Sequence, residues 1–152
     1  MFKTILVALD GSERSTGAIR LAEGAAGGSS AKFVVVHVRE LLAGRGAGPR
    51  HLDEEARAAT VHEQAEILRS HGFEVTERTY STFKRPAELI VRVARRSHAD
   101  LIVTGLAEHR SLLGAALTAA TPCALVHRAP CPVLVAPDVA HDAAPAAPAL
   151  AA

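Results

Sequence analysis

Aromatic residues are scarce in this sequence, which contains no tryptophan, one tyrosine and four phenylalanines, or 3% of its 152 positions. Hydrophobic residues nevertheless account for 49% of the chain. This combination predicts a core built from valine, leucine, isoleucine and alanine. A chain of this length fits one domain and can bury most of its apolar surface without disulfides or bound metals.

Cysteine is also scarce, with two residues, Cys123 and Cys131. Their spacing of eight positions matches no common metal-binding pattern. No export signal is visible, and disulfides are rare in proteins that stay in the cytoplasm. We therefore interpret both cysteines as small buried hydrophobic residues.

Long apolar runs and an excess of one charge are missing. The first apolar run, Ile5–Leu9, is too short to cross a membrane or to form the core of a signal peptide. We therefore expect a cytoplasmic protein with no membrane partner. Seventeen lysines and arginines stand against sixteen aspartates and glutamates, and no basic stripe is visible. Nucleic acid is therefore not expected as a partner.

Residue patterns that mark common catalytic and metal sites are missing too. The chain has no HExxH, CxxC or nucleophile-elbow motif, and its eight histidines are scattered. We therefore expect a protein that is not an enzyme and that holds no metal.

What the chain does contain is an alternation of apolar runs with stretches rich in helix-forming residues. Continuous aliphatic runs are typical of strands covered on both faces, as in a parallel sheet. Such runs occupy Ile5–Leu9, Phe33–Val38, Leu101–Thr104 and Val133–Ala136, whereas Val75–Tyr80 alternates and is expected at a sheet edge. Helices are expected at Glu13–Ala26, roughly Asp53–His71, Pro86–Ser97 and Leu112–Arg128. The order of these elements predicts one α/β domain with right-handed crossovers.

Two segments fall outside this pattern. Ala43–Arg50 is rich in glycine and is expected to form a mobile loop after the second strand. Asp138–Ala152 consists mainly of alanine and proline, with too little side-chain bulk to pack against a core. We expect this tail to be disordered.

Four short motifs follow one another along the chain: ILVALDGSE at Ile5–Glu13, His37-Val38, ADLIV at Ala99–Val103 and APCPVLV at Ala129–Val135. In this order and spacing they resemble the universal stress protein family over residues 3 to 137. The resemblance implies an open, doubly wound five-stranded parallel sheet with strand order 3-2-1-4-5, like that of flavodoxins and adenine nucleotide hydrolases. It also implies a universal stress protein domain at residues 1–137 and a non-enzymatic role in stress response or signalling.

In sheets of this kind, ligands bind beyond the carboxyl ends of the strands, where the strand order reverses. By resemblance to nucleotide-binding members, Asp10 would contact a ribose or a metal, and the backbone around Leu9 and Val38 would hold adenine. Asp10 before Gly11-Ser12 is also typical of a strand-to-helix turn in which the carboxylate caps backbone N–H groups, and we favour this capping role. The candidate crevice is formed by Ala8, Leu9, Asp10, Val38, Thr104 and Gly105.

ATP-binding members of the family carry Gly-x2-Gly-x9-Gly-Ser/Thr after the fourth strand. Gly105 supplies the first glycine here, but Glu108 stands at the second position and Thr118 or Ala119 at the third. A carboxylate and added side-chain bulk beside the phosphates should repel a triphosphate. We therefore expect no tight binding of ATP. The alternative is a switch protein that binds ATP or another adenine nucleotide between strands 1 and 4.

Positive charge lies near the crevice in two places, at His109-Arg110 and at Phe83-Lys84-Arg85-Pro86, where the family often has a small Gly-Asp-Pro turn. Either segment could attract an anion, but such exposed residues more often form a solvated turn. The resemblance further implies a homodimer paired through the fifth strand, so a purely structural dimerisation module stays open. The protein partner cannot be identified from the sequence.

Overall fold

The computed structural model describes residues 1–12, 15–28, 30–40, 50–105 and 120–137. They contain a five-stranded parallel sheet in the order β3-β2-β1-β4-β5, which confirms the predicted strand order and fold class. The strands are β1 (Thr4–Leu9), β2 (Lys32–Glu40), β3 (Glu74–Thr82), β4 (Leu101–Gly105) and β5 (Val133–Ala136). The helices are α1 (Ser15–Ala26), α2 (Arg50–Ser70), α3 (Pro86–Arg96) and α5 (Ala120–Arg128).

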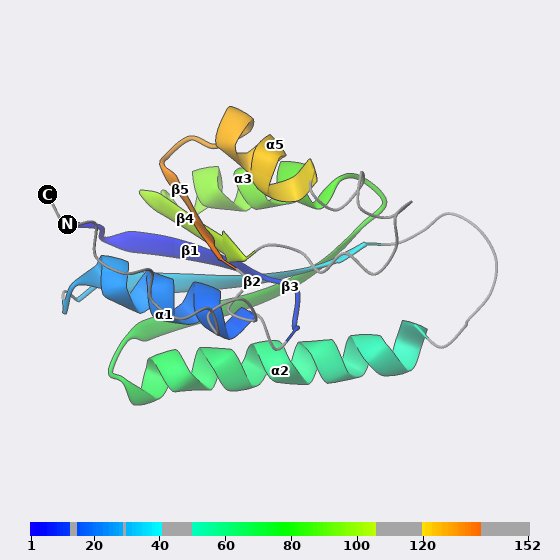
Figure 1. Cartoon of the computed structure of the whole chain (residues 1–152), viewed down its shortest axis with the longest axis horizontal. Helices are drawn as coiled ribbons and strands as arrows, with labels where there is room; N and C mark the ends of the chain where they lie inside the picture. The colour runs from blue at the N-terminus through cyan, green and yellow to red at the C-terminus, as the bar shows by residue number, and fades with distance from the viewer. Residues whose placement is uncertain (13–14, 29, 41–49, 106–119, 138–152) are drawn as a thin grey trace, which may run out of the picture.

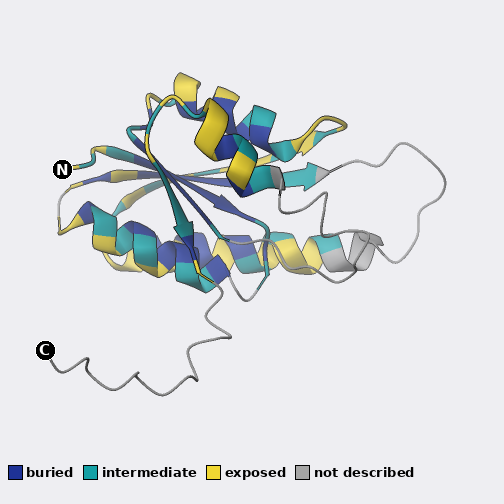
Figure 2. Cartoon of the chain, turned by 45° about the horizontal axis from the view of Figure 1, so that its top comes forward, coloured by how far each residue is buried: buried dark blue, intermediate teal, exposed yellow. Residues whose placement is uncertain are grey.

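Helices cover both faces of the sheet, α1 and α2 on one side and α3 and α5 on the other (Figure 1). Successive strand residues point to opposite faces, so Ile5 and Val7 join the core under α1 and α2 while Leu6 joins the core under α3 and α5. The central strands β1, β2 and β4 are mostly buried, the edge strands β3 and β5 are more exposed, and the outer helix surfaces are exposed (Figure 2). Phe33 is the one aromatic ring among the described buried hydrophobic residues, which confirms the predicted aliphatic core.

The edge position predicted for the third strand is confirmed, because β3 pairs only with β2. Both strands are longer than predicted: their register continues to Glu40 and Thr82, past the end of β1 at Leu9. Polar residues can occupy these extensions because the sheet there lies beyond the apolar core.

Other element ends also differ from the predictions. α2 begins at Arg50, before the predicted start near Asp53, while the predicted helix Leu112–Arg128 is described from Ala120 onward. The predicted loop at 43–49 and the predicted tail at 138–152 lie outside the described residues. No helix in the described ranges is both long and apolar enough to span a membrane.

The interpretation of the two cysteines as buried residues is wrong for Cys123. Its side chain is exposed, because α5 turns this position away from the buried Leu125. Cys131 is half-buried against the core under α3 and α5. Burial, together with the nearby Asp100 carboxylate, raises the pKa of the Cys131 thiol. A raised pKa makes this thiol less reactive, which fits a packing role.

A close backbone contact joins the end of β1 to α2. Gly11, two positions after the end of β1, has a backbone φ of +72°, a conformation that residues other than glycine rarely adopt. A Cβ added there would lie 2.4 Å from the carbonyl oxygen of Arg57 and 2.6 Å from its Cβ. Only glycine therefore allows α2 to approach the turn after β1 this closely.

Replacing Gly11 with alanine should lower the free energy of unfolding by at least about 2 kcal/mol, because the backbone is strained and α2 must move. Gly24→Ala is the matched control, since Gly24 is exposed within α1 and its Cβ would meet no described atom within 4 Å. That variant should be more stable by about 0.5–1 kcal/mol. Urea unfolding measures both values. Equal effects of the two substitutions would show that the contact with α2 does not constrain the fold.

Candidate functional site

The carboxyl ends of β2, β1 and β4 lie side by side, because these three strands are neighbours in the sheet. Ala8 pairs in register with Thr104, and Leu9 pairs with His37, so Gly105 and Val38 each lie one position farther along a neighbouring strand. The fold thereby brings the six predicted crevice residues together at the carboxyl ends of the strands, here called the carboxyl edge. Their role in binding a nucleotide stays a prediction.

The crevice residues differ in what they can present to a ligand. The side chains of Ala8, Leu9 and Thr104 are buried, and Val38 is half-buried against the core under α3 and α5. These residues can therefore contribute mainly backbone groups at the strand ends. At Gly105 an added Cβ would meet no described atom within 4 Å, so the described part of the edge is open there.

Asp10 stabilises the turn that leads from β1 into α1. Its Oδ1 accepts hydrogen bonds from the backbone N–H of Ser12 at 3.0 Å and from its hydroxyl at 2.7 Å. The same oxygen accepts a third bond from the buried hydroxyl of Ser15 at 2.8 Å. The structure thus supports the capping role, with the carboxylate accepting the backbone N–H of Ser12. Oδ2 has no hydrogen-bond partner among the described residues.

These hydrogen bonds also affect the charge of Asp10. Partial burial raises the pKa of the carboxyl group, whereas hydrogen bonds from Ser12 and Ser15 and the nearby Arg57 guanidinium lower it, and the net pKa lies below its usual range. Asp10 is therefore ionised at neutral pH. Its free oxygen can accept a hydrogen bond from a hydroxyl group, such as that of a sugar.

Arg57 is a residue at this edge that the sequence analysis did not identify. It lies on α2, and its Nη1 donates to the backbone carbonyl of Asp10 at 3.2 Å. The contact depends on the close approach of α2 to Gly11, which joins residues far apart in the chain. No local motif marks Arg57, so only the packing of α2 reveals this exposed cation beside the crevice.

His37 forms a second link between α2 and the same edge. The ring is buried, with Nδ1 3.0 Å from the carbonyl oxygen of Leu9 and Nε2 2.8 Å from Oε1 of Glu54. Because the carbonyl can only accept, Nδ1 donates in the contact with Leu9. Arg39 Nε lies 3.0 Å from the same Glu54 oxygen but is not aligned for a hydrogen bond. These contacts hold α2 over the ends of β1 and β2.

Other predicted features lie beyond the described residues. Among them are all positions at which the phosphate-loop motif differs from the family pattern. Nowhere in the described ranges do three or more histidine, cysteine, aspartate or glutamate side chains gather as a metal site. The predicted residues that lie outside the described ranges are Glu108, His109, Arg110, Thr118 and Ala119.

Comparison with known proteins finds relatives that match most of the chain. The model of the universal stress protein family matches residues 1–137. A universal stress protein from Thermus aquaticus, described as lying in the QAH/OAS sulfhydrylase 3′ region, is 34% identical over 142 residues, covering 89% of this chain and 98% of its own.

Solved structures agree with this match. The universal stress protein from Archaeoglobus fulgidus in complex with dAMP is 25% identical, with a TM-score of 0.64 over 88% of this chain and 97% of its own. A universal stress protein in complex with cAMP is 24% identical, with a TM-score of 0.66 over 88% of this chain and 96% of its own. The latter identity is low enough that the likeness shows the fold alone.

The hydrogen bonds of Asp10 predict a pH-dependent contribution to stability. Because the folded pKa lies below the unfolded one, the ionised carboxylate stabilises the fold above the unfolded pKa, and this stabilisation is lost as the pH falls through the folded pKa. Asp10→Asn should therefore lower the free energy of unfolding by about 1–2 kcal/mol at neutral pH, and by less in acid.

Urea unfolding at neutral pH and at about pH 3 measures this difference. Glu55→Gln removes an exposed carboxylate on α2 that has no hydrogen bond among the described residues, and should change stability by less than about 0.5 kcal/mol at either pH. A constant effect of Asp10→Asn across the pH range would contradict the assignment.

Proposed function

The chain belongs to the universal stress protein family, and from that premise we propose that it is a non-enzymatic, cytoplasmic module of stress response or signalling that does not hold ATP tightly. The observation that supports this proposal is the pairing of polar groups at the carboxyl edge. Asp10 binds Ser12 and Ser15, and His37 lies between Leu9 and Glu54. Among the described residues of this edge, these hydrogen bonds stabilise the turn into α1 and the packing of α2.

A second function, binding of an adenine nucleotide with one phosphate, is supported by a separate observation. Oδ2 of Asp10 has no partner among the described residues, and it can accept a hydrogen bond from a ribose hydroxyl. A relative with the same fold is described in complex with dAMP and another with cAMP, each of which carries one phosphate. A monophosphate would depend less than ATP on the glycines missing from the phosphate loop.

We also propose that two copies of the chain associate through β5. This strand lies at the end of the sheet and, among the described strands, pairs with β4 alone, so one row of its backbone groups has no strand partner in the described part of the chain. Val133, Leu134 and Val135 are half-buried, which leaves apolar surface along the edge. Antiparallel pairing of β5 with its counterpart would satisfy these groups in an isologous dimer centred near Leu134.

Calorimetric titration with AMP and with Mg-ATP separates the two nucleotide hypotheses. The native protein should bind Mg-ATP weakly, because Glu108 adds a negative charge at a position where the family motif has glycine. Glu108→Gly combined with Thr118→Gly or Ala119→Gly should strengthen Mg-ATP binding. If AMP binds, Asp10→Asn should weaken it by about tenfold, the expected loss of a hydrogen bond to a charged group.

Asp100→Asn is the matched control, because this carboxylate binds the backbone N–H groups of Lys3 and Thr4 at the opposite edge of the sheet. It should leave AMP affinity unchanged. Sub-micromolar binding of Mg-ATP by the native chain would overturn the main proposal. Absence of binding for both nucleotides would leave that proposal standing and reject the second function.

Light scattering tests the dimer. The native protein should have twice the monomer mass of 15.9 kDa. Val135→Lys should shift it toward the monomer, because two like charges would lie close together near the twofold axis. Thr79→Lys places the same charge on the exposed surface of β3, the other edge strand, and should leave the dimer intact. A monomeric native protein at micromolar concentration would contradict the proposal.

A further inference from the structure

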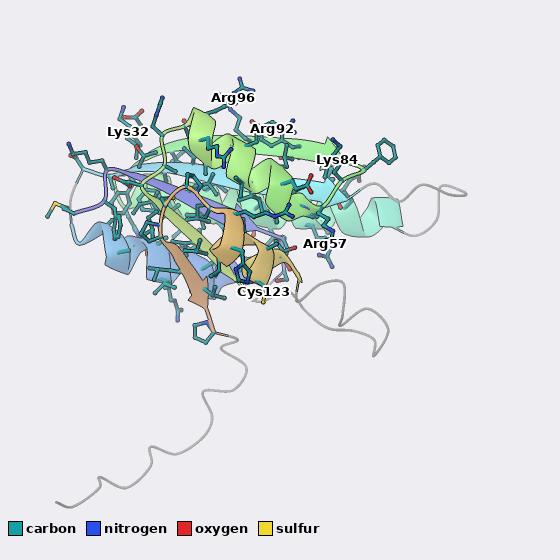
Figure 3. The ribbon with its side chains drawn as sticks, turned by 90° about the horizontal axis from the view of Figure 1, so that it is seen from above. Lys32, Arg57, Lys84, Arg92, Arg96 and Cys123 are labelled. Atoms are coloured by element: carbon teal, nitrogen blue, oxygen red, sulfur yellow. The ribbon has the colours of Figure 1, made fainter. Side chains whose placement is uncertain are left out.

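Five cations lie along one side of α3 and the turn before it: Lys84, Arg85, Arg92, Arg95 and Arg96, here called the basic face. All five are exposed. Figure 3 shows Arg92 and Arg96 projecting outward on the side of α3 away from α5, with Lys84 beyond the start of the helix. Arg92 lies seven positions after Arg85, three before Arg95 and four before Arg96, spacings that place side chains on one side of a helix.

The opposite side of α3 explains why these positions are held in place. It is apolar and buried against β2 and α5, so the rotation of the helix is determined by packing. The basic face therefore presents its side chains outward from a rigid element. In the sequence the arginines of α3 are interrupted by apolar residues and form no continuous basic run. The 3.6-residue period of the helix brings them to one side. The residues on the buried side are Ala87, Ile90, Val91, Val93 and Ala94.

Carboxylates are few on α3 and α5, the two described helices on this face of the sheet. Glu88 is the one acidic residue of α3, and its Oε1 lies 3.4 Å from Nη1 of Arg128 on α5. Among the described residues, no carboxylate oxygen lies within 4.0 Å of any cation of the basic face. Arg78 on β3 adds a further exposed cation without a described ion pair.

Several cations elsewhere on the described surface are paired. Lys32 lies 2.9 Å from Glu74, Arg39 lies 3.0 Å from Glu54, and Arg69 contacts two glutamates. Exposed cations without a described ion pair, such as Arg20 on α1, lie singly there, whereas five gather on α3 and the turn before it, in a chain with a net charge of only +1. Such an arrangement creates a local positive potential that attracts an anionic partner.

Helix stability does not account for the whole basic face. Arg95 and Arg96 lie in the last turn of α3, where positive charge complements the helix dipole. Lys84 and Arg85 lie at the other end, beside the partial positive charge of the helix N-terminus, where a cation is unfavourable. Their placement is therefore better explained by an external ligand.

The chemistry of the basic face suits planar or tetrahedral anionic groups. Four of its five cations are arginines, whose planar guanidinium groups bind carboxylates and phosphates through two parallel hydrogen bonds. Phe83, which is 73% exposed, precedes Lys84 and offers one aromatic anchor at the end of the row. From Arg85 to Arg96 the row extends about 16 Å, the length of three helical turns. A short segment with acidic side chains and one apolar residue matches this surface.

We propose that the basic face binds an acidic segment of another protein, with carboxylates spaced over about three helical turns and an apolar side chain against Phe83. Single-stranded nucleic acid fits less well, because no aromatic ring lies between the cations to stack on bases. A membrane surface also fits less well, because Phe83 is the one large apolar side chain exposed beside these cations in the described part of the chain.

Fluorescence anisotropy with a labelled acidic peptide tests this proposal. The probe is a synthetic peptide of about sixteen residues, with glutamates three or four positions apart and one leucine. Arg92→Glu and Arg85→Glu should each weaken binding by about tenfold, and raised salt should weaken it further. Phe83→Ala should weaken binding by a few-fold without changing the salt dependence.

Arg20→Glu is the matched control, because Arg20 is an exposed arginine in the middle of α1 with no described ion pair. It changes the net charge equally and should alter affinity by less than about twofold. The melting temperature should not fall for Arg85→Glu, because a negative charge suits the start of α3. Loss of binding with unchanged stability would separate recognition from a structural role.

Three results would overturn the proposal: no salt-sensitive binding of the peptide by the native protein, equal losses for Arg20→Glu and Arg92→Glu, or binding of an oligouridylate or of vesicles containing phosphatidylserine that is tenfold tighter than that of the peptide. AMP titration of Arg92→Glu provides an independent check. The nucleotide crevice lies at the strand ends, so this variant should bind AMP like the native protein whether or not the peptide binds.

Discussion

The contact between Gly11 and the backbone of α2 is the constraint on which the carboxyl edge depends. The missing side chain lets α2 approach within a distance that any Cβ would block. This approach places Arg57 beside the carbonyl of Asp10 and brings Glu54 to His37. One glycine thus determines which polar side chains of α2 reach the ends of β1 and β2. Arg57 and Asp10, for example, are more than forty positions apart in the sequence.

Asp10 illustrates how one carboxylate can serve both the fold and a ligand. Three donors converge on Oδ1, so this oxygen is committed to the turn into α1. The same bonds keep the group ionised and fix the direction of Oδ2. Capping of the turn by Oδ1 and acceptance of a ribose hydroxyl by Oδ2 are therefore compatible roles of the same carboxylate.

The distribution of charge distinguishes the two layers of helices. On the side of α2, several acids and bases are paired with one another, and the pair of Arg69 with Glu77 ties the helix to β3. On the side of α3, apolar packing holds the helix and its arginines remain exposed. The first arrangement uses charge to stabilise the fold, whereas the second leaves charge available for recognition.

The sequence by itself determined the elements, the parallel sheet and the family, because hydrophobic periodicity and short motifs are local properties of the chain. It also determined that Val75–Tyr80 lies near an edge, since alternation reports a strand with one solvated face. Tertiary structure decided what depends on the placement of helices. The exposure of Cys123 and the arrival of Arg57 and Glu54 at the crevice follow from helix rotation and packing. The arginines of α3 already have helical spacing in the sequence, but only the packing of the apolar side of the helix decides that they face outward.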